Sequence, residues 1–282
     1  MPELPEVETI ARGVDERLRG DRIVEVWFGS HSEPFKTPPA EQAHGLEGKI
    51  IVEVHRVGKH IVCELGGDGE SPSAEKTSPV AAQWIVHLGM TGRLLVTTPD
   101  GPVAAHTHAR LILASGREMR FVDPRRFGRL EFRELKQEKA FTGPGSEPLT
   151  ITPEAFAELF RGRRLAIKAA LLNQTLLHGV GNIYADESLF RAGIRPKRMA
   201  GRLKRAELFK LHGAIQEVLR HAIELGGSSV SDYVDANGVR GFFQLEHRVY
   251  LRTGQPCLVC GTPIRRILLA GRGTHFCPAC QR

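Results

Sequence analysis

The spacing of apolar residues differs between the two halves of the chain and indicates two structural regions. The first half opens with a helical stripe made of Val7, Ile10, Ala11, Val14 and Leu18. Short apolar runs bounded by turn residues follow it, a pattern typical of strands. These runs cover residues 23–28, 50–57, 60–65, 84–88, 93–96, 109–113, 118–122 and 130–132. We therefore expect an N-terminal helix followed by an antiparallel β-sandwich or barrel.

The second half changes to helical spacing. Thr152 offers a capping hydroxyl and is followed by Pro153 and Glu154, which together are a typical helix start. Further helices are predicted at residues 164–173, 182–192 and 204–225. The expected fold class is α+β with several domains. The predicted domains are a sandwich at 1–133, a linker at 134–150, a helical domain at 151–250 and a cysteine-bearing tail at 251–282.

Two segments lack periodicity and contain many turn-forming residues. Residues 66–79 are rich in Gly, Ser, Pro and Glu, and we interpret them as a mobile loop insertion at the edge of the sandwich. Residues 228–243 follow Gly226-Gly227 and are predicted to form a polar, glycine-bearing loop.

Composition places the chain among ordinary globular proteins. It has 282 residues, of which 41% are hydrophobic and 25% charged. This balance excludes a collagen, a disordered chain and a disulfide scaffold. No apolar run approaches the roughly 18 residues of a membrane span, and the N-terminus lacks a signal-peptide pattern. We therefore expect a cytosolic protein without a membrane partner.

Positive charge is concentrated in two places. Residues 247–282 contain six arginines and no acidic residue, while the chain as a whole has a net charge of +7. A second basic cluster consists of Arg191, Arg195, Lys197, Arg198, Arg202, Lys204 and Arg205. Such clusters favour a polyanionic partner, although a solvated basic surface explains them equally well at this stage.

The cysteine spacing predicts a metal site. Cys257 and Cys260 form one C-x-x-C pair, and Cys277 and Cys280 form a second pair 16 residues later. Four thiolates suit one tetrahedral, structural Zn²⁺ without an open position for water. Paired disulfides are the alternative, which a cytosolic setting disfavours. Residues 264–276 between the pairs are predicted to form a β-hairpin, and Cys63 is expected to be a packed core residue.

The N-terminus carries a second chemical possibility. Removal of Met1 would expose the secondary amine of Pro2, and an α-amino group titrates near roughly 7.7–8.0, so part of it is nucleophilic at neutral pH. A secondary amine condenses with an aldehyde-like carbon to form an iminium ion. Glu3 could move protons beside it. The simpler alternative is that Pro-Glu-Leu-Pro-Glu is only an acidic helix start.

The ordered motifs of the chain resemble those of the formamidopyrimidine-DNA glycosylase family, bacterial enzymes that excise oxidised purines. The motifs are PELPEVETIARGV at the N-terminus, RVGKHIV, HLGMTGRL, DPRRFGRL, AIKAALLNQTLLHGVGNIYADESLFRAGIRP, GFFQLEHRVYLRTGQPCLVCGTPI and GRGTHFCPACQ. They span nearly the whole chain. Endonuclease VIII shares the architecture but typically begins Pro-Glu-Gly-Pro-Glu, so Leu4 favours the purine branch.

The resemblance implies a role for several residues near the N-terminus. Pro2 would attack the sugar C1′ of a flipped nucleotide, and β and δ eliminations would then cut the strand. Glu3 would act as acid and base, and Glu6 would support the site. Lys59 would contact a phosphate near the lesion. His60 departs from the aromatic residue often found after that lysine, which leaves its contact open.

The resemblance also implies a set of DNA-binding residues. Met90, Arg125 and Phe127 match the family's intercalating trio. The phosphate-facing positions are Lys168, Asn182 at a helix N-terminus within a helix–two-turn–helix, and Arg272 at the tip of the zinc hairpin. His106 is assigned to the DNA-binding set as well. Residues 228–243 correspond to the loop that closes over an everted base.

Damaged double-stranded DNA is therefore the expected partner, bound by a monomer with one zinc and no redox or nucleotide cofactor. Three alternatives stay open at the level of sequence. They are an endonuclease VIII-like enzyme for oxidised pyrimidines, a non-catalytic zinc-ribbon DNA-binding protein and an RNA-binding zinc module. The lesion contacts of the 228–243 loop are not assignable from sequence, nor is the removal of Met1.

Overall fold

The computed structural model describes residues 1–67, 80–229 and 233–282 and divides into two compact units. Unit 1 contains Met1–Thr142 together with Ser228–Gly241. Unit 2 contains Gly143–Gly227 and Phe242–Arg282. A short segment from the second half of the chain therefore belongs to the first unit. Residues 68–79, most of the expected insertion, and residues 230–232 of the expected loop lie outside the described residues.

Unit 1 is a β-sandwich with an N-terminal helix, as predicted. One sheet has the strand order β1-β6-β7-β5 and the other β2-β3-β4-β8, and every pairing is antiparallel. The strands are β1 Ile23–Phe28, β2 Ile50–Val57, β3 His60–Gly66, β4 Val80–His87, β5 Arg93–Thr97, β6 Thr107–Leu113, β7 Glu118–Val122 and β8 Arg129–Glu134. Apolar residues of both sheets meet those of the helix in one core.

Helix α1 (Leu4–Leu18) packs its apolar stripe against this core, beside β2 and β3. All residues of the stripe are buried, because the 3.6-residue period keeps them on one face. Helix α2 (Pro39–Leu46) is absent from the sequence prediction. Only Gln42 and Leu46 of this helix are buried, so its apolar signal is weak.

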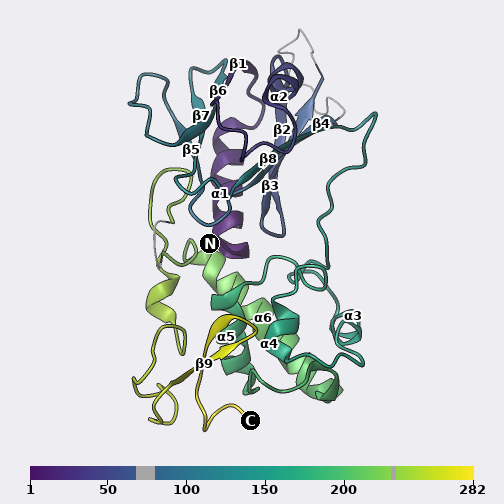
Figure 1. The fold of residues 1–282 in the computed structure, drawn as a ribbon, viewed down its shortest axis with the longest axis vertical. Helices are drawn as coiled ribbons and strands as arrows, with labels where there is room; N and C mark the ends of the chain where they lie inside the picture. The colour runs from purple at the N-terminus through teal and green to yellow at the C-terminus, as the bar shows by residue number, and fades with distance from the viewer. Residues whose placement is uncertain (68–79, 230–232) are drawn as a thin grey trace. The chain divides into compact units, whose positions relative to one another are not determined.

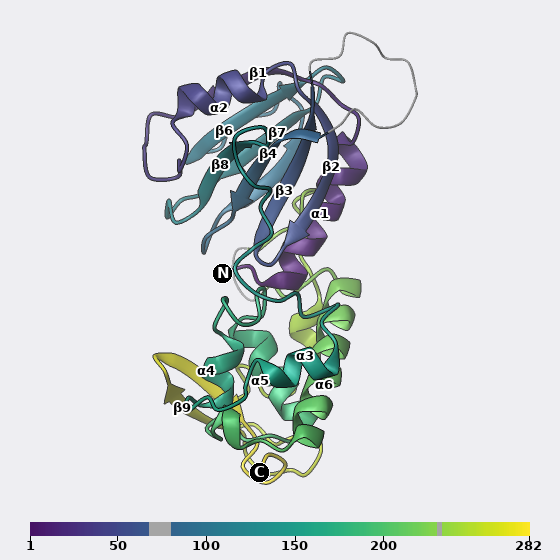
Figure 2. The same ribbon diagram turned by 90° about the vertical axis from the view of Figure 1, so that its right-hand side faces the viewer.

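Unit 2 is helical and ends in a hairpin. Its helices are α3 Pro153–Glu158, α4 Ile167–Leu171, α5 Asn182–Ala192 and α6 Arg205–Glu224, with short 3₁₀ turns η1 Ala200–Arg202 and η2 Phe243–Glu246. Strands β9 (Arg265–Leu269) and β10 (Arg272–Phe276) pair antiparallel. Figures 1 and 2 show α5 beside α6, with the hairpin beside α5.

Local chemistry sets the helix boundaries of unit 2. The Thr152 side chain accepts a hydrogen bond from the Ala155 N–H and so caps α3 as predicted. α4 starts later than predicted, because Ala166 is extended and bridges to Met199. α5 ends at Gly193, whose φ of 73° is the left-handed conformation that glycine adopts readily. In the described part of the chain, no helix is long and apolar enough to cross a membrane.

Candidate functional site

The N-terminal residues of unit 1 are held in place by a capping box. Pro2 is buried, and Glu3 is the residue that precedes α1. The Glu3 side chain accepts from the Glu6 backbone N–H, and Glu6 Oε2 accepts from the Glu3 backbone N–H at 2.8 Å. Two otherwise unsatisfied donors of the helix end are thereby satisfied. The backbone next to Pro2 is consequently fixed.

The second oxygen of the Glu6 carboxylate binds the segment that returns from the second half of the chain. The Ser228 N–H donates to Glu6 Oε1 at 2.7 Å. Farther along, Tyr233 and Ala236 join the hydrophobic core, and the Val96 N–H donates to the Ala236 carbonyl. The predicted 228–243 loop is thus anchored on α1 through Ser228 and on β5 through Ala236.

Lys59 lies in the tight turn between β2 and β3 and is 8% exposed. Gly58 has a φ of 61°, which suits a two-residue hairpin turn. Arg56 fixes this turn to α1, because its Nε donates to Glu8 at 2.8 Å and its Nη1 donates to the Gly58 carbonyl. Arg56 therefore joins the helix that follows Pro2 to the turn that carries Lys59.

His60 has a definite environment in the structure. Its ring lies 4.8 Å from the His87 ring and 4.7 Å from the Phe141 ring, so histidine replaces an aromatic packing partner here. Burial lowers the pKa of His60 to about 3 and that of His87 to about 4, and Lys59 contributes to the latter shift. Neutral His87 then accepts the Gly89 N–H at its Nδ1.

The structure brings Met90, Arg125 and Phe127 together on the surface of unit 1. Met90 is 41% and Phe127 50% exposed, and the Arg125 guanidinium lies 4.8 Å from the Phe127 ring centre. The two turns touch at Gly89: a Cβ there would lie 2.5 Å from the Gly128 nitrogen. Only glycine permits this approach. Exposed apolar side chains that gather in one place can mark a binding site, whereas single ones are common on protein surfaces.

Asp123, which sequence reasoning did not single out, fastens the two turns together. Its buried carboxylate accepts from the Thr91 hydroxyl at 2.6 Å, from the Gly128 N–H at 2.7 Å and from the Arg125 N–H at 3.3 Å. The Asp-Pro pair that begins this turn is a sequence signal for such capping.

Backbone geometry directs the Arg125 and Arg126 side chains to different places. Arg126 has a φ of 57°, an unusual value for a residue other than glycine, and its guanidinium contacts His31 and Glu33. Arg125 instead remains beside Phe127. His106 also has a positive φ of 65° and is exposed, and its carbonyl accepts from the Asp123 N–H.

In unit 2, the structure corrects the expectation that Lys168 faces a DNA phosphate. The side chain is 1% exposed, and its Nζ lies 2.7 Å from Asp186 Oδ1. It also donates to the Gly273 carbonyl at 3.0 Å and to the Thr274 hydroxyl at 2.9 Å. A lysine this buried requires a charged partner. The ammonium group is therefore directed to the hairpin.

Asn182 and Arg272 meet at the same hairpin. Asn182 begins α5, and its Nδ2 donates to the Gly273 carbonyl at 3.0 Å. Arg272 is the first residue of β10 and is exposed. Within the described residues, Arg272 forms no ion pair. A helix N-terminus next to an exposed arginine is suited to bind an anion.

The four cysteines of the tail are gathered as a zinc site. All of their Sγ atoms lie within 4.8 Å of one another, and three of the Sγ–Sγ distances are 3.4, 3.5 and 3.9 Å. Tetrahedral zinc with bonds of about 2.3 Å separates its sulfur ligands by about 3.8 Å, so the arrangement fits the metal. No disulfide joins the five cysteines, all of which lie in the described residues, and Cys63 is buried as predicted.

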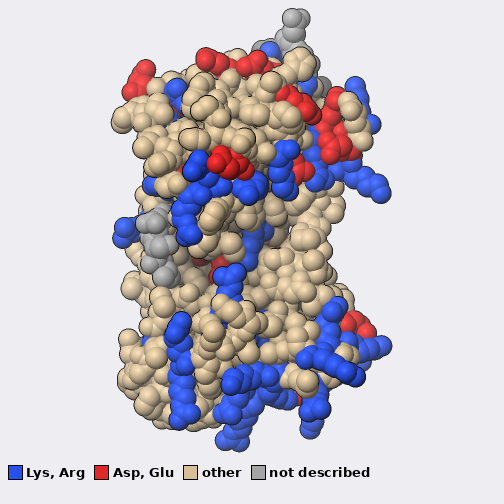
Figure 3. Space-filling model, viewed as in Figure 1, with Lys and Arg blue, Asp and Glu red and all other residues tan. Residues whose placement is uncertain are grey.

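Ion pairs neutralise part of the second basic cluster: Arg198 pairs with Glu207, and Arg191 pairs with Glu217. Arg195 donates to the Pro278 carbonyl and keeps its charge. In the view of Figure 3, Lys and Arg side chains nevertheless outnumber acidic ones over unit 2, in the lower part of the picture. The hairpin contributes arginines that are exposed, among them Arg265 and Arg272.

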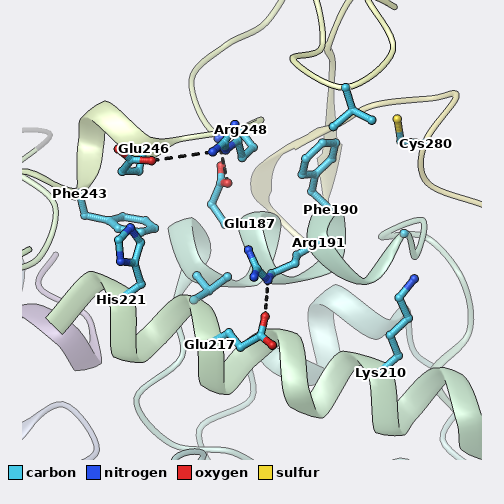
Figure 4. Close-up of a pocket in the computed structure, with 13 residues that line it drawn as sticks. Glu187, Phe190, Arg191, Lys210, Glu217, His221, Phe243, Glu246, Arg248 and Cys280 are labelled. Carbon is cyan, nitrogen blue, oxygen red and sulfur yellow. Dashed lines mark hydrogen bonds and ion pairs between the residues drawn. The ribbon is translucent and has the colours of Figure 1, made fainter. Parts of the chain in front are cut away.

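A pocket of about 700 Å³ lies elsewhere in unit 2, between α5, α6 and the segment that contains η2 (Figure 4). Ion pairs join Arg191 to Glu217 and Arg248 to Glu246 along its wall. Positive and negative side chains balance there, so its charge favours no ligand class. None of the expected DNA-binding residues lines this pocket.

Comparison with known proteins identifies each part of the chain. Residues 1–130 match the model of the formamidopyrimidine-DNA glycosylase N-terminal domain, residues 143–234 its H2TH domain, and residues 254–282 the zinc finger found in FPG and IleRS. The formamidopyrimidine-DNA glycosylase of Solibacter usitatus is 46% identical over the full length of both chains. That of Symbiobacterium thermophilum is 42% identical over all of this chain and 89% of its own.

Solved structures agree with this result. The Lactococcus lactis Fpg in complex with DNA containing an abasic site is 35% identical, with a TM-score of 0.86 and 99% of each chain covered. MutM in complex with DNA containing carbocyclic 8-oxo-G is also 35% identical, with a TM-score of 0.87 over all of both chains.

A β-sandwich with a buried proline at position 2, an H2TH domain and a four-cysteine zinc finger together define a class of DNA glycosylases. Within that class, the chain belongs to the formamidopyrimidine-DNA glycosylase family. Its tail binds one structural zinc through Cys257, Cys260, Cys277 and Cys280.

Proposed function

We propose that this chain removes oxidised purines, 8-oxoguanine and formamidopyrimidines, from duplex DNA by base excision, with Pro2 as the nucleophile. Its full-length relatives bear the name of this enzyme, and related structures hold damaged DNA. The observation that carries the proposal is the double role of Glu6. One carboxylate fixes both the backbone beside Pro2 and the start of the 228–241 segment.

The chemistry requires a free Pro2 amine, and hence loss of Met1. Its nitrogen lone pair attacks C1′ of a flipped nucleotide, the bond from C1′ to the base breaks, and the base leaves with the electron pair and takes up a proton. Glu3 protonates the ring oxygen as the sugar opens to an iminium ion. Proton loss from C2′ then expels the 3′ phosphate, and a second elimination expels the 5′ phosphate.

The DNA-binding roles divide between the units. In unit 1, Lys59 contacts a phosphate near the lesion, Met90 and Phe127 fill the space left by the flipped nucleotide, and Arg125 pairs with the estranged base. His106 contacts the DNA strand beside them. In unit 2, the α5 N-terminus at Asn182 and the exposed Arg272 bind phosphates, which positions the strand without reading its sequence.

Borohydride trapping tests the proposal. Duplexes carrying 8-oxoguanine opposite cytosine are incubated with zinc-loaded protein, and the reduced adduct is mapped by peptide mass analysis. We expect one adduct at Pro2, from protein lacking Met1. An adduct confined to a lysine, or none with a verified Pro2 terminus, would refute the assignment. The same protein at several concentrations in analytical ultracentrifugation tests the further expectation that it acts as a monomer.

Oxidised pyrimidines are a second candidate substrate class. One related structure is a complex of the Lactococcus lactis Fpg with DNA containing an oxidised pyrimidine. Excision rates on the two lesion types in otherwise identical duplexes decide between them. We expect faster excision of the purine, and a faster pyrimidine reaction would place this chain's activity closer to that of endonuclease VIII.

A further inference from the structure

Unit 2 contains a buried polar network that the proposed chemistry does not use. Asp186 and Lys168 form its centre, and both are almost fully shielded from water. Burial of such a pair gains little stability over an apolar pair of the same size, because both charges lose their hydration. Orientation of a neighbouring group is one function that an apolar pair could not perform.

The hydrogen bonds of this network connect α4 and α5 to the residues that follow Arg272. Lys168 Nζ donates to the Thr274 hydroxyl at 2.9 Å, and that hydroxyl donates to the Arg272 carbonyl at 3.2 Å. Asp186 Oδ2 accepts from the His275 backbone N–H at 2.8 Å. The backbone immediately after Arg272 is thus tied to α4 and α5 at successive residues.

The preceding residues provide less constraint. Ala270 and Gly271 form the hairpin turn, and both have positive φ values, 49° and 73°. The Arg272 side chain itself is exposed. Its direction therefore depends on the β10 backbone, which the network holds through Thr274 and His275.

We infer that Asp186, Lys168 and Thr274 form a positioning relay that aims Arg272 at its ligand. The inference rests on the proposed function, in which Arg272 binds a DNA phosphate. The relay also sets the spacing between Arg272 and Asn182, since Asn182 and Asp186 lie one turn apart on α5 and both bind the hairpin. Neither Asp186 nor Thr274 touches DNA in this scheme.

Thr274 offers a matched pair of variants. Thr274→Val keeps the shape of the side chain and removes the hydroxyl, whereas Thr274→Ser keeps the hydroxyl. KM and kcat are measured on a duplex carrying 8-oxoguanine, together with zinc content and melting temperature. We expect Thr274→Val to raise KM about two- to tenfold, the effect of one hydrogen bond, with kcat unchanged. Thr274→Ser should restore KM to within about twofold.

A double-mutant cycle with Arg272→Ala separates positioning from general support of the fold. If the relay acts through Arg272, Thr274→Val adds no further increase in KM to the Arg272→Ala protein. Thr274→Ala, which also removes the hydroxyl and leaves the Lys168–Asp186 pair intact, should behave in the same way if Thr274→Val loses zinc. Glu217→Gln, which breaks an exposed ion pair of α6 in the same unit, serves as a control.

Two outcomes would overturn the relay. One is an equal increase in KM from Thr274→Val with and without Arg272, and the other is an unchanged KM when Arg272 itself is replaced. Both are distinguishable from failure of the proposed function, because the wild-type adduct at Pro2 is measured separately. If that adduct forms and either outcome occurs, the chemistry stands and the relay does not.

Discussion

Replacement of Asp123 tests most directly whether the turns that carry Met90 and Phe127 must be held together for excision from duplex DNA. Its two oxygens receive the Thr91 hydroxyl and the Gly128 N–H at 2.6 and 2.7 Å, inside the protein. Asp123→Asn preserves size and one carbonyl oxygen but removes the charge. The charged group that joins the two turns is then replaced by a neutral amide, while the Pro2 region keeps its own contacts.

The size of the effect follows from hydrogen-bond strength. Bonds to a charged group contribute about 1.5–3 kcal/mol each, roughly twice the value of neutral ones. After Asp123→Asn, the amide oxygen can accept the Gly128 N–H and the amide NH2 can donate to the Thr91 hydroxyl, so two charge-assisted bonds become two neutral ones and about 2 kcal/mol is lost in total. If the whole loss weakens binding of the transition state because Met90 and Phe127 are misplaced, it corresponds to about a thirtyfold decrease in kcat/KM.

The assay compares two substrates for the same protein. Excision of 8-oxoguanine from a duplex requires the space of the flipped nucleotide to be filled, whereas cleavage at an abasic site in a single strand has no partner base to support. Asp123→Asn should lower the duplex reaction about thirtyfold and leave the single-strand reaction within about twofold. Asp100→Asn makes the same charge change at an exposed loop position of unit 1 and should alter neither.

An equal decrease on both substrates would refute this reasoning, because it would mean that Asp123 supports the Pro2 site itself. An unchanged duplex reaction would refute it as well, provided that Asp123→Asn melts at the wild-type temperature. Thr91→Val, which removes one of the two strong bonds, should give a smaller decrease of the same kind.

Three further predictions concern stability and metal binding. Lys168→Met leaves the Asp186 carboxylate buried without its cation. It should lower the free energy of unfolding by about 3–5 kcal/mol, measured by urea titration with circular dichroism. A decrease below about 1 kcal/mol would contradict the buried ion pair. His60 and His87 have pKa values lowered to about 3 and 4, so unfolding takes up protons below pH 6.5. Stability should therefore be full above pH 6.5 and fall toward pH 4, by up to about 1.4 kcal/mol per pH unit for each ring. Thermal melts between pH 7 and pH 4.5 measure this slope. Burial also lowers the pKa of His247 to about 4, so His60→Phe should remove roughly a third of the slope. Removal of zinc by a chelator, or Cys277→Ser, should abolish tight DNA binding in filter or anisotropy assays, with the unfolding transition of unit 1 retained.

Most of the fold was predictable because its helices and strands bury apolar residues that recur at regular spacing along the chain. The α1 stripe and the alternating strands of the sandwich follow directly from spacing, and α5 was predicted with its bounds, Asn182–Ala192. Helix α2 was missed because burial of only Gln42 and Leu46 leaves no continuous stripe. The start of α4 was misplaced because a bridge between Ala166 and Met199, distant in sequence, decides it.

The candidate site was predictable to the extent that residue type alone reveals chemistry. Four cysteines in two close pairs indicate zinc, and a proline after Met1 indicates a possible amine nucleophile. Lys168 was misinterpreted because a lysine on a short helix is ordinarily exposed, and only tertiary packing reveals its carboxylate partner. Asp123 and Asp186 were missed for the same reason, since buried acids that accept backbone hydrogen bonds have no spacing of their own.

Those buried acids share one physical role, which explains why a chain with a net charge of +7 keeps carboxylates in its interior. Glu6 joins the backbone beside Pro2 to Ser228, Asp123 joins two exposed turns, and Asp186 joins α5 to the hairpin. Glu187 likewise accepts three successive N–H groups, from Arg248 to Tyr250, although burial raises its pKa. A carboxylate can receive several N–H donors from distant segments at once, which no apolar side chain can do. Some of the groups proposed to meet DNA, among them Phe127 and Arg272, are exposed and have little packing of their own, so the buried acids behind them hold the backbone that carries them.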